Sequence, residues 1–376
     1  MAGSNQSSQR PPDVSSAFRD QEARFARAFT LLQVAIHRRA FPGAALAVTY
    51  RGELVALQGF GRFTYEANSP EVEADTIFDL ASVTKVIATT AMAMLLYERG
   101  LLHLDTKVAH ILPEFVSLAP PFQQPGRAAV TMRMLLAHSS GLPAYIKLFE
   151  TQRTCYELVR AAMTTPLVAT PGTKADYSDI GFIILGEILA KLAGQPLDDF
   201  VKQEVFERLG MSRTCFNPPT TTRQAIPPTE DDRTFRHRII QGEVNDENAY
   251  VMGGVSGHAG LFSPAIDVAR FAEYILRGGA PIVRPDTIQL FTRREASPAD
   301  TSRALGWDTP SPPSTSGKHF SARSFGHLGY TGTSLWVDLE RQLSITLLTN
   351  RTWPDRSSQQ IKVVRPLIYD AIVEAL

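Results

Sequence analysis

Residues 82–97 read SVTKVIATTAMAMLLY. This apolar run predicts a buried helix that ends near Gly100, with Ser82 and Lys85 at its front. Because residues three apart share one face of a helix, the Lys85 amine can lie against the Ser82 hydroxyl. An adjacent base makes a serine a good nucleophile, and a free N–H in the first turn can bind a developing oxyanion. The alternative is a structural helix with a serine cap and a surface lysine.

The composition indicates a globular protein large enough for two lobes. The chain has 376 residues, of which 44% are hydrophobic and 20% charged. Its 38 basic and 38 acidic residues cancel and no basic run stands out, so we expect no nucleic-acid partner. Cys155 and Cys215 form neither a disulfide framework nor a CxxC pair. The histidines lack metal-ligand spacing, so we expect no metal ion and no other cofactor.

The N-terminus favours a cytoplasmic protein. Residues 1–14 are polar, lack the apolar core of a secretory signal and are expected to form a disordered leader. The longest apolar runs have about a dozen residues, whereas roughly 20 are needed to span a bilayer. We therefore expect no membrane span, and the sequence leaves the oligomeric state open.

Strands are predicted near both ends of the chain. An amphipathic helix at 18–36, capped by Ser15 or Ser16, precedes a β-hairpin made of 44–50 and 53–59. Near the C-terminus, strands at 334–338 and 343–349 precede a closing helix at 361–376. Between these ends we expect helices broken by proline-rich loops, including an apolar helix at 180–192 and a helix that begins with Ser263 as cap and Pro264 at its first position.

These segments together predict an α/β fold. An antiparallel sheet would join the N- and C-terminal strands, with helices on both faces and a mainly helical second lobe. We expect a single domain at 15–376, composed of an α/β lobe (15–105 and 255–376) and a helical lobe (106–254). The active site would lie between the lobes, where pockets commonly form.

Two further clusters carry side chains suited to catalysis. Tyr177 lies two residues before Asp179 at the start of the apolar helix, where it can relay protons beside Lys85. The alternative is an anchored aromatic with Asp179 as a helix cap. His327, in a glycine-rich segment that leads into a strand, can contact a ligand, although a plain glycine-rich turn is the alternative.

The order of these motifs is more specific than any one of them. SVTK at 82–85, YSD at 177–179 and HLG at 327–329 follow one another as Ser-x-x-Lys, Tyr-x-Asn and Lys-Thr-Gly or His-x-Gly do in serine β-lactamases and penicillin-binding proteins. The chain resembles this superfamily from about residue 20 to its C-terminus. The amino-acid sequence at 78–81, 135–143 and 257–263 resembles its class C-like branch, which includes family VIII-type esterases and peptidoglycan-recycling amidases.

The resemblance implies a role for each matching residue. Ser82 would be the acylated nucleophile, Lys85 its general base and Tyr177 the proton shuttle. The backbone N–H groups of Ser82 and Tyr330 would form the oxyanion hole. Asp179, His327 and Gly329 would line the substrate channel.

Two of these residues depart from the superfamily pattern. Asp179 replaces the usual asparagine, and a carboxylate accepts hydrogen bonds but cannot donate them. His327 replaces the lysine that supports a substrate carboxylate, and histidine, with its ordinary pKa near 6.5, is only partly charged at neutral pH.

The implied activity is that of a serine hydrolase that forms a Ser82 acyl-enzyme on an ester or amide bond. The two departures and the polar N-terminus favour a small-acyl esterase or a peptidoglycan-fragment amidase, so the expected substrate is a small ester, an amide or a muropeptide. A β-lactamase or D,D-peptidase is the alternative. A non-catalytic scaffold on the same fold is a further one.

Overall fold

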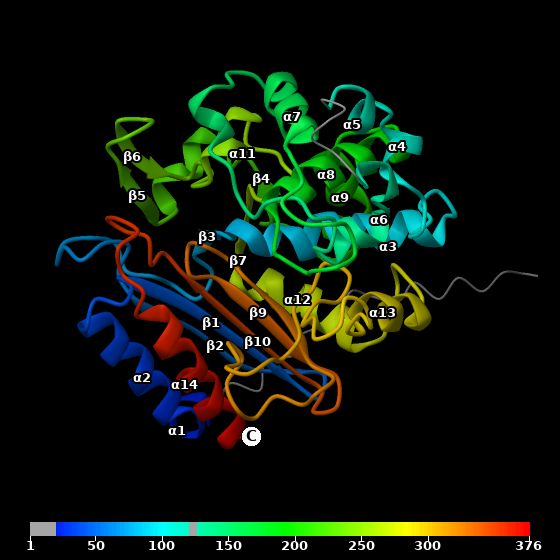
Figure 1. Ribbon diagram of the computed structural model, residues 1–376. Coiled ribbons are helices and arrows are strands. Elements are labelled where there is room, and N and C mark those ends of the chain that lie inside the picture. Colours follow the sequence, from blue (N-terminus) through cyan, green and yellow to red (C-terminus); the bar gives the residue numbers. More distant parts are fainter. Residues whose placement is uncertain (1–19, 120–125) are drawn as a thin grey trace, which may run out of the picture.

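A five-stranded antiparallel sheet in the computed structural model joins the two ends of the chain (Figure 1). The structure describes residues 20–119 and 126–376. The strand order is β2-β1-β10-β9-β8, with β1 at Gly43–Tyr50, β2 at Glu53–Gly61, β8 at Phe325–Leu328, β9 at Ser334–Asp338 and β10 at Leu343–Thr349. Since β1 pairs with β10, the predicted sheet of N- and C-terminal strands is confirmed.

Helices cover both faces of this sheet. Helices α1 (Gln21–Arg24), α2 (Ala26–His37) and α14 (Ile361–Glu374) lie on one face, and α12 (Ala265–Leu276) lies on the other (Figure 1). Every residue of β10 is buried as a result. The predicted terminal helices are confirmed over the described residues, while the leader at 1–14 and the caps Ser15 and Ser16 lie outside them.

Most helices of the middle of the chain lie above the sheet in Figure 1. They are α4 (Val108–Ile111), α5 (Glu114–Ser117), α6 (Met132–Leu136), α7 (Cys155–Thr164), α8 (Asp179–Ala193), α9 (Leu197–Val201), α10 (Glu207–Leu209) and α11 (Glu247–Val251). Helix α13 (Pro285–Thr292) follows α12. The single domain and its lobe boundaries at 105/106 and 254/255 stay a prediction.

The helix that follows Ser82 runs through the core. After β3 (Ile77–Asp79) the chain forms a 3₁₀ turn at Ala81–Val83, a π-helical segment at Lys85–Thr90 and helix α3 at Ala91–Glu98. It therefore ends close to Gly100, as predicted. All residues from 85 to 96 are buried, because this helix contacts α8, α9 and α13.

The middle of the chain also contains strands, so the expectation of helices alone was wrong. β4 (Cys215–Phe216) and β3 flank β7 (Leu261–Pro264) in a three-stranded sheet. β5 (Pro228–Asp232) and β6 (Arg238–Gln241) form a separate hairpin at the left of Figure 1. The residues of β5 read PTEDD, in which apolar and polar side chains do not alternate, so the usual strand signal is missing.

The predicted cap of α12 was also wrong. Ser263 and Pro264 end strand β7, where Ser263 pairs with Phe78 of β3. The Ser263 hydroxyl lies 2.7 Å from the Thr214 hydroxyl, and no side chain caps α12. Ser263 is therefore held by its strand pairing and by the contact of its hydroxyl group with Thr214, and it does not cap the helix.

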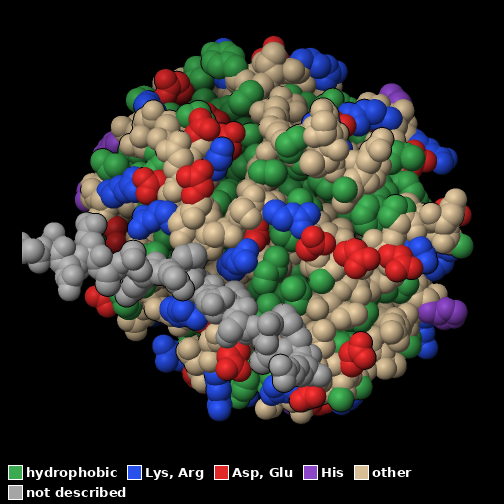
Figure 2. Space-filling view, turned by 180° about the vertical axis from the view of Figure 1, so that it is seen from behind, with side chains coloured by type: hydrophobic (Ala, Val, Ile, Leu, Met, Phe, Trp, Pro, Cys, Tyr) green, Lys and Arg blue, Asp and Glu red, His purple; other side chains and the backbone are tan. Residues whose placement is uncertain are grey.

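Charged side chains of both signs are interspersed over the face shown in Figure 2. Among the described residues no single helix is long and apolar enough to cross a membrane. Two consecutive helical segments, Asp179–Ala193 and Leu197–Leu209, would qualify together by length and composition, although a bend of 70° separates them.

Helix α8 approaches the loop before β7 through two glycines. A Cβ at Gly186 would lie 2.9 Å from the Gly257 Cα, which is too close for an ordinary contact. The Gly257 carbonyl accepts a hydrogen bond from the Thr89 hydroxyl at 2.6 Å. The glycine pair therefore brings α8, the loop and the central helix together.

We expect Gly186→Ala to lower the free energy of unfolding by about 1–3 kcal/mol, because the added methyl group overpacks this contact. Gly181→Ala on the same helix is the matched control, since its Cβ would meet neighbours only at 3.5 Å or beyond. Urea denaturation of both variants measures the difference. Equal stability of the two variants would contradict the prediction.

Candidate active site

Ser82 lies in the tight turn between β3 and the central helix. The preceding residue, Ala81, has a φ of 46°, in the left-handed region that disfavours side chains with a Cβ. Asp79 holds this turn, because its Oδ1 accepts the Ala81 N–H at 2.8 Å and its Oδ2 accepts the Asn245 N–H at 2.6 Å. Burial raises the pKa of Asp79 to about 6. A buried carboxyl group therefore fixes the backbone that presents Ser82.

The turn after β8 is bonded to the same backbone. The Thr331 hydroxyl donates to the Asp79 carbonyl and the Thr333 hydroxyl donates to the Leu80 carbonyl, each at 2.8 Å. A Cβ at Gly329 would clash with the Thr333 hydroxyl and the Leu80 carbonyl. Gly329, expected in the substrate channel, thus lies at the junction that joins the sheet edge to the nucleophile turn.

Ser82 Oγ lies between the predicted base and the predicted proton shuttle. Lys85 Nζ donates to it at 3.0 Å and the Tyr177 hydroxyl donates to it at 2.7 Å. Both groups are within the distance needed for proton transfer. The structure thus brings together the three residues expected to be catalytic, although 95 positions separate Ser82 from Tyr177.

Lys85 is fully buried and its ammonium group is fully hydrogen-bonded. Besides Ser82, it donates to Asp179 Oδ1 at 2.6 Å and to the His258 carbonyl at 2.9 Å. These contacts use all three donors of the ammonium group. Burial lowers the pKa of Lys85, and the adjacent Asp179 carboxylate counteracts part of that lowering.

The Tyr177 hydroxyl has two acceptors for its one proton. It lies 2.7 Å from Ser82 Oγ and 2.9 Å from Asp179 Oδ1. Burial, and then the Asp179 carboxylate, raise the pKa of Tyr177 well above its ordinary value. The phenol is therefore protonated in the free protein and can serve as a proton donor.

Asp179 is not the cap of α8, so that alternative was wrong. The cap is Ser178, whose Oγ accepts the Gly181 N–H at 3.0 Å and donates to the Pro143 carbonyl at 2.7 Å. Because the neighbouring serine satisfies the helix N-terminus, the Asp179 carboxylate is left to bind Lys85 and Tyr177.

Two buried histidines flank Tyr177. The His138 ring lies 4.8 Å from the Tyr177 ring, and its Nδ1 accepts the Ser178 N–H at 3.0 Å. The His327 ring, on strand β8, lies 6.0 Å from the Tyr177 ring. Burial, together with the nearby cations Lys85 and Arg303, lowers the pKa of both histidines well below the usual range. His327 is therefore uncharged at neutral pH.

A pocket of about 500 Å³ opens at Ser82. Five of the residues singled out by the sequence line it, namely Ser82, Tyr177, Asp179, His327 and Tyr330. Lys85 lies buried next to the nucleophile. The geometry therefore agrees with a site built on these residues, whose individual roles remain proposals.

Sequence reasoning missed the charged residues of the pocket wall, which are Asp246, Glu247, Arg303, Asp308 and Arg356. Asp246 caps α11 by accepting the Ala249 N–H at 2.8 Å, so the pair Asp246-Glu247 looks like an ordinary helix start. The two arginines belong to no motif. The signal that the sequence offered for these residues was a helix-cap residue, Asp246, followed directly by a second acidic residue, Glu247.

The charges of this wall are paired with one another. Arg356 binds Glu247 at 2.7 Å, and Arg303 lies 3.6 Å from Asp308. With the uncharged His327, the pocket wall carries four carboxylates and two guanidinium groups. Among the described residues of the pocket wall, each guanidinium group therefore has a carboxylate partner.

Asp246 also contacts the loop that accepts Lys85. Its Oδ1 lies 2.8 Å from His258 Nε2, and the other ring nitrogen of His258 lies 2.7 Å from the Ser256 hydroxyl. Burial alone would raise the pKa of Asp246, but His258 and Lys85 lower it to about 2. Within the described residues, no group of three or more metal-ligating side chains is found.

The buried histidines make stability dependent on pH. Since their folded pKa values are lowered, the unfolded chain binds more protons below about pH 6.5, and each histidine then costs up to about 1.4 kcal/mol of unfolding free energy per pH unit. We expect stability to fall as the pH drops below 6.5. His138→Asn, which keeps an acceptor and suits the left-handed φ of 56°, should weaken this dependence.

Denaturation curves between pH 5 and pH 8 measure the effect. His103→Asn, at an exposed histidine, is the control and should retain the wild-type pH profile. An unchanged profile in His138→Asn would contradict the assignment of an uncharged buried His138.

Comparisons with known proteins agree with this geometry. The model of the Beta-lactamase family matches residues 22–365. The N-acetylmuramyl-L-alanine amidase of Bacillus subtilis (strain 168) is 33% identical over 344 residues, which cover 83% of this chain and 77% of that protein. A protein of Escherichia coli (strain K12) named "Putative D-alanyl-D-alanine carboxypeptidase" is 34% identical over 307 residues, which cover 73% of this chain and 69% of that protein.

Among solved structures, the hydrolase EstCE1, described as having promiscuous acyltransferase activity, superposes with a TM-score of 0.75 at 22% identity. The match covers 93% of this chain and 99% of that one, and at this identity it shows the fold. The family match shows more, because it spans residues 22–365 and so includes the Ser82 segment, and the two relatives cover 83% and 73% of the chain. The chain belongs to the Beta-lactamase family, a family of serine hydrolases.

Proposed function

We propose that this protein is an amidase that cleaves the bond between N-acetylmuramic acid and L-alanine in peptidoglycan fragments. The observation that carries the proposal is the pair of hydrogen bonds from Lys85 and Tyr177 to Ser82, in a pocket without an unpaired cation. The Bacillus subtilis relative, named for this bond, indicates the substrate class. A cytoplasmic location stays a prediction from the sequence.

Acylation begins at Ser82. Burial favours the neutral amine of Lys85, which takes the Ser82 proton while Ser82 Oγ attacks the lactyl carbonyl carbon. The developing oxyanion is bound by the N–H groups of Ser82 and Tyr330. Across the described part of the chain, neither N–H donates to a backbone acceptor, and Arg351 holds the Tyr330 carbonyl through a hydrogen bond of 2.7 Å.

Collapse of the tetrahedral intermediate breaks the C–N bond. The Tyr177 proton passes to the leaving amine of L-alanine, and the Lys85 ammonium returns a proton to Tyr177 through the shared Asp179 carboxylate. The product amine departs and the lactyl ester of Ser82 remains. A water molecule then attacks this ester and gives one proton to the same Lys85–Tyr177 pair. The pair passes this proton to Ser82 Oγ as the C–O bond breaks, and the muramic acid is released and ionises to its carboxylate.

The charge of the pocket favours this substrate over the alternatives. β-Lactams and D-Ala-D-Ala peptides carry a carboxylate next to the reacting bond. Here His327 is uncharged, while Arg356 and Arg303 face carboxylates of the wall. In a muramyl peptide the carbonyl group of the leaving L-alanine belongs to the next peptide bond, so no carboxylate lies next to the scissile amide. A β-lactamase or D,D-peptidase activity is therefore the weaker candidate.

We expect Tyr177→Phe to separate amide hydrolysis from ester hydrolysis. An amine must be protonated as it leaves, whereas p-nitrophenolate leaves without a proton. The variant should lose a factor on the order of 10²–10⁴ in kcat/KM for an N-acetylmuramyl-L-alanyl peptide, with a smaller loss for p-nitrophenyl butyrate. Steady-state kinetics on both substrates measure the two losses.

Ser82→Ala should abolish both reactions, and Tyr156→Phe, at an exposed tyrosine of α7, should abolish neither. Ester hydrolysis by the wild type without any amide cleavage would make the protein a small-acyl esterase. If neither reaction occurs and a serine-reactive probe does not acylate Ser82, the alternative of a non-catalytic scaffold on the same fold would be favoured.

The pH profile tests whether Lys85 is the base. Asp179→Asn removes the carboxylate that raises the pKa of Lys85, so the neutral amine becomes populated at lower pH. We expect the acid limb of kcat/KM for p-nitrophenyl butyrate to move down by about 1 pH unit or more. Asp176→Asn is the matched control, because Asp176 binds the surface residue Lys174 at 2.7 Å. An unmoved acid limb in Asp179→Asn would exclude Lys85 as the base.

A further inference from the structure

The catalytic pocket adjoins a second compartment of about 530 Å³ beside the β5–β6 hairpin. Tyr145, Glu247 and Arg356 line both spaces, so the two share a wall. The acyl-transfer steps described above use only the first space. A substrate that extends beyond its scissile amide would enter the second.

The shared wall is held rigidly. The Arg356 guanidinium binds the Glu230 carboxylate through contacts of 2.8, 2.9 and 2.6 Å and binds Glu247 at 2.7 Å. Asn245 donates to Glu230 at 3.1 Å. Such charge-assisted, bidentate contacts fix the polar atoms that face both spaces before any ligand arrives.

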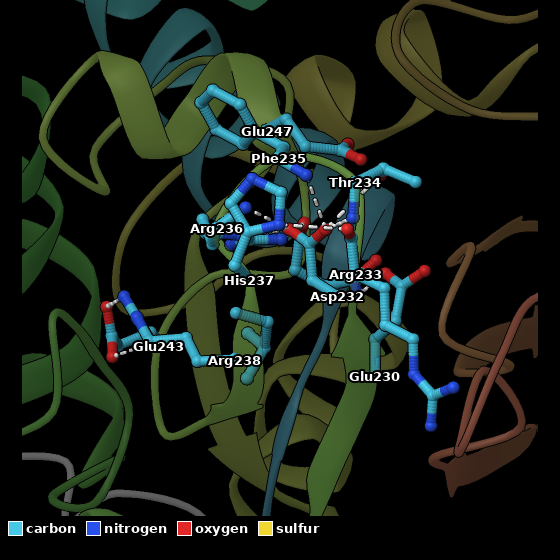
Figure 3. A network of polar contacts seen from close by, with 12 residues as sticks. Glu230, Asp232, Arg233, Thr234, Phe235, Arg236, His237, Arg238, Glu243 and Glu247 are labelled. Atoms are coloured by element: carbon cyan, nitrogen blue, oxygen red, sulfur yellow. Dashed lines mark hydrogen bonds and ion pairs between the residues drawn. The ribbon is translucent and has the colours of Figure 1, made fainter.

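Hydrogen bonds around Asp232 and Arg236 hold the turn of the β5–β6 hairpin against the segment that precedes Glu247 (Figure 3). Asp232, at the end of β5, accepts the Phe235 N–H at 2.9 Å and the Arg236 Nε–H at 2.8 Å. The Arg236 guanidinium also donates to the carbonyl groups of Val244 and Asn245, at 2.7 and 2.8 Å. These bonds tie the hairpin turn to the segment that leads into Glu247, so Phe235 is held in a fixed position.

Aromatic rings form part of the compartment. Phe235 and Phe149 both line it, with ring centroids 4.7 Å apart. Phe235 also packs edge-on against Tyr250 at 6.1 Å. Tyr145, at the boundary with the catalytic pocket, is 39% exposed. Fixed aromatic faces of this kind bind the apolar face of a ring at little entropic cost.

The basic and acidic residues of the compartment are equal in number, and each basic side chain has an ion-pair or hydrogen-bond partner. Three are basic and three are acidic, namely Lys147, Arg153 and Arg356, and Glu150, Glu230 and Glu247. Lys147 binds Glu150 at 3.1 Å, and Arg153 donates to the Phe149 carbonyl at 2.7 Å. Two of the three cations are thus paired with carboxylates and Arg153 is bonded to carbonyl oxygens, and neutral hydroxyl and amide groups can bond to the edges of these pairs.

We infer that the second compartment is a saccharide subsite, which holds an N-acetylated pyranose ring while the scissile amide lies at Ser82. A pyranose is uncharged, has an apolar face that suits Phe235 and carries hydroxyl groups that suit the Glu230–Arg356 wall. The inference rests on the proposed amidase function, because it assigns a place to the sugar of the muramyl substrate.

Kinetics with and without the sugar test the subsite. N-Acetylmuramyl-L-alanyl-D-isoglutamine is compared with lactoyl-L-alanyl-D-isoglutamine, which has the same scissile amide but no ring. We expect the wild type to prefer the muramyl substrate, and Phe235→Leu, which keeps apolar volume, to reduce that preference in kcat/KM by about tenfold. Tyr156→Leu, at an aromatic residue 73% exposed on α7, is the matched control and should retain the preference.

A second variant keeps the test independent of packing. Thr234→Arg places a long charged side chain in the compartment from an exposed position and removes one hydrogen bond, from the Thr234 hydroxyl to Asp232 at 3.3 Å. It should reduce the preference at least as much as Phe235→Leu. A wild type without preference for the sugar, or a preference that survives in both variants, overturns the inference.

Calorimetry separates this inference from the proposed function. Both ligands are titrated into Ser82→Ala, with and without Phe235→Leu. Tighter binding of the muramyl ligand that is lost with Phe235→Leu supports the subsite even if the wild type cleaves neither ligand, in which case only the proposed function fails. Equal binding of the two ligands, which indicates a peptide subsite, overturns the inference.

Discussion

The burial of one ammonium group is the constraint on which this structure depends. An unpaired buried charge is far too costly to persist, so Lys85 has to find three acceptors. They come from the turn before the central helix, from Asp179 at the start of α8 and from the His258 carbonyl before β7. The same contacts that stabilise the Lys85 ammonium group therefore assemble the elements of the site, while burial lowers the pKa of Lys85, as the proposed role of a base requires.

A second set of contacts positions the nucleophile itself. The buried Asp79 carboxyl group holds the strained Ala81 backbone, and the hydroxyls of Thr331 and Thr333 bond the β8–β9 turn to the same segment. The N–H of Ser82 and that of Tyr330 consequently belong to two elements that are fastened to each other. Strain at one residue is tolerated because several hydrogen bonds around it would have to break together.

In the proposed function, substrate selectivity follows from charged side chains that pair with one another. In the wall made by Glu230, Arg356 and Glu247 the guanidinium group is paired, Arg303 lies 3.6 Å from Asp308, and burial keeps His327 uncharged. Neutral substrates fit such a surface better than anionic ones, because an added carboxylate would compete with carboxylates already in place. The β5–β6 hairpin extends this surface away from Ser82.

The sequence by itself determined the terminal strands and helices and the central helix, because local periodicity encodes them. It marked Ser82, Lys85 and Tyr177 through a motif order that resembles that of serine β-lactamases and penicillin-binding proteins. It missed β5 and β6, whose polar residues lack alternation, and it missed Asp246, Arg303 and Arg356, which no motif marks. Only the tertiary structure decided that Ser178 caps α8, which releases Asp179 to bind Lys85. Burial, and with it the uncharged state of His327, also arises only when distant segments meet, since desolvation is a property of the assembled surroundings.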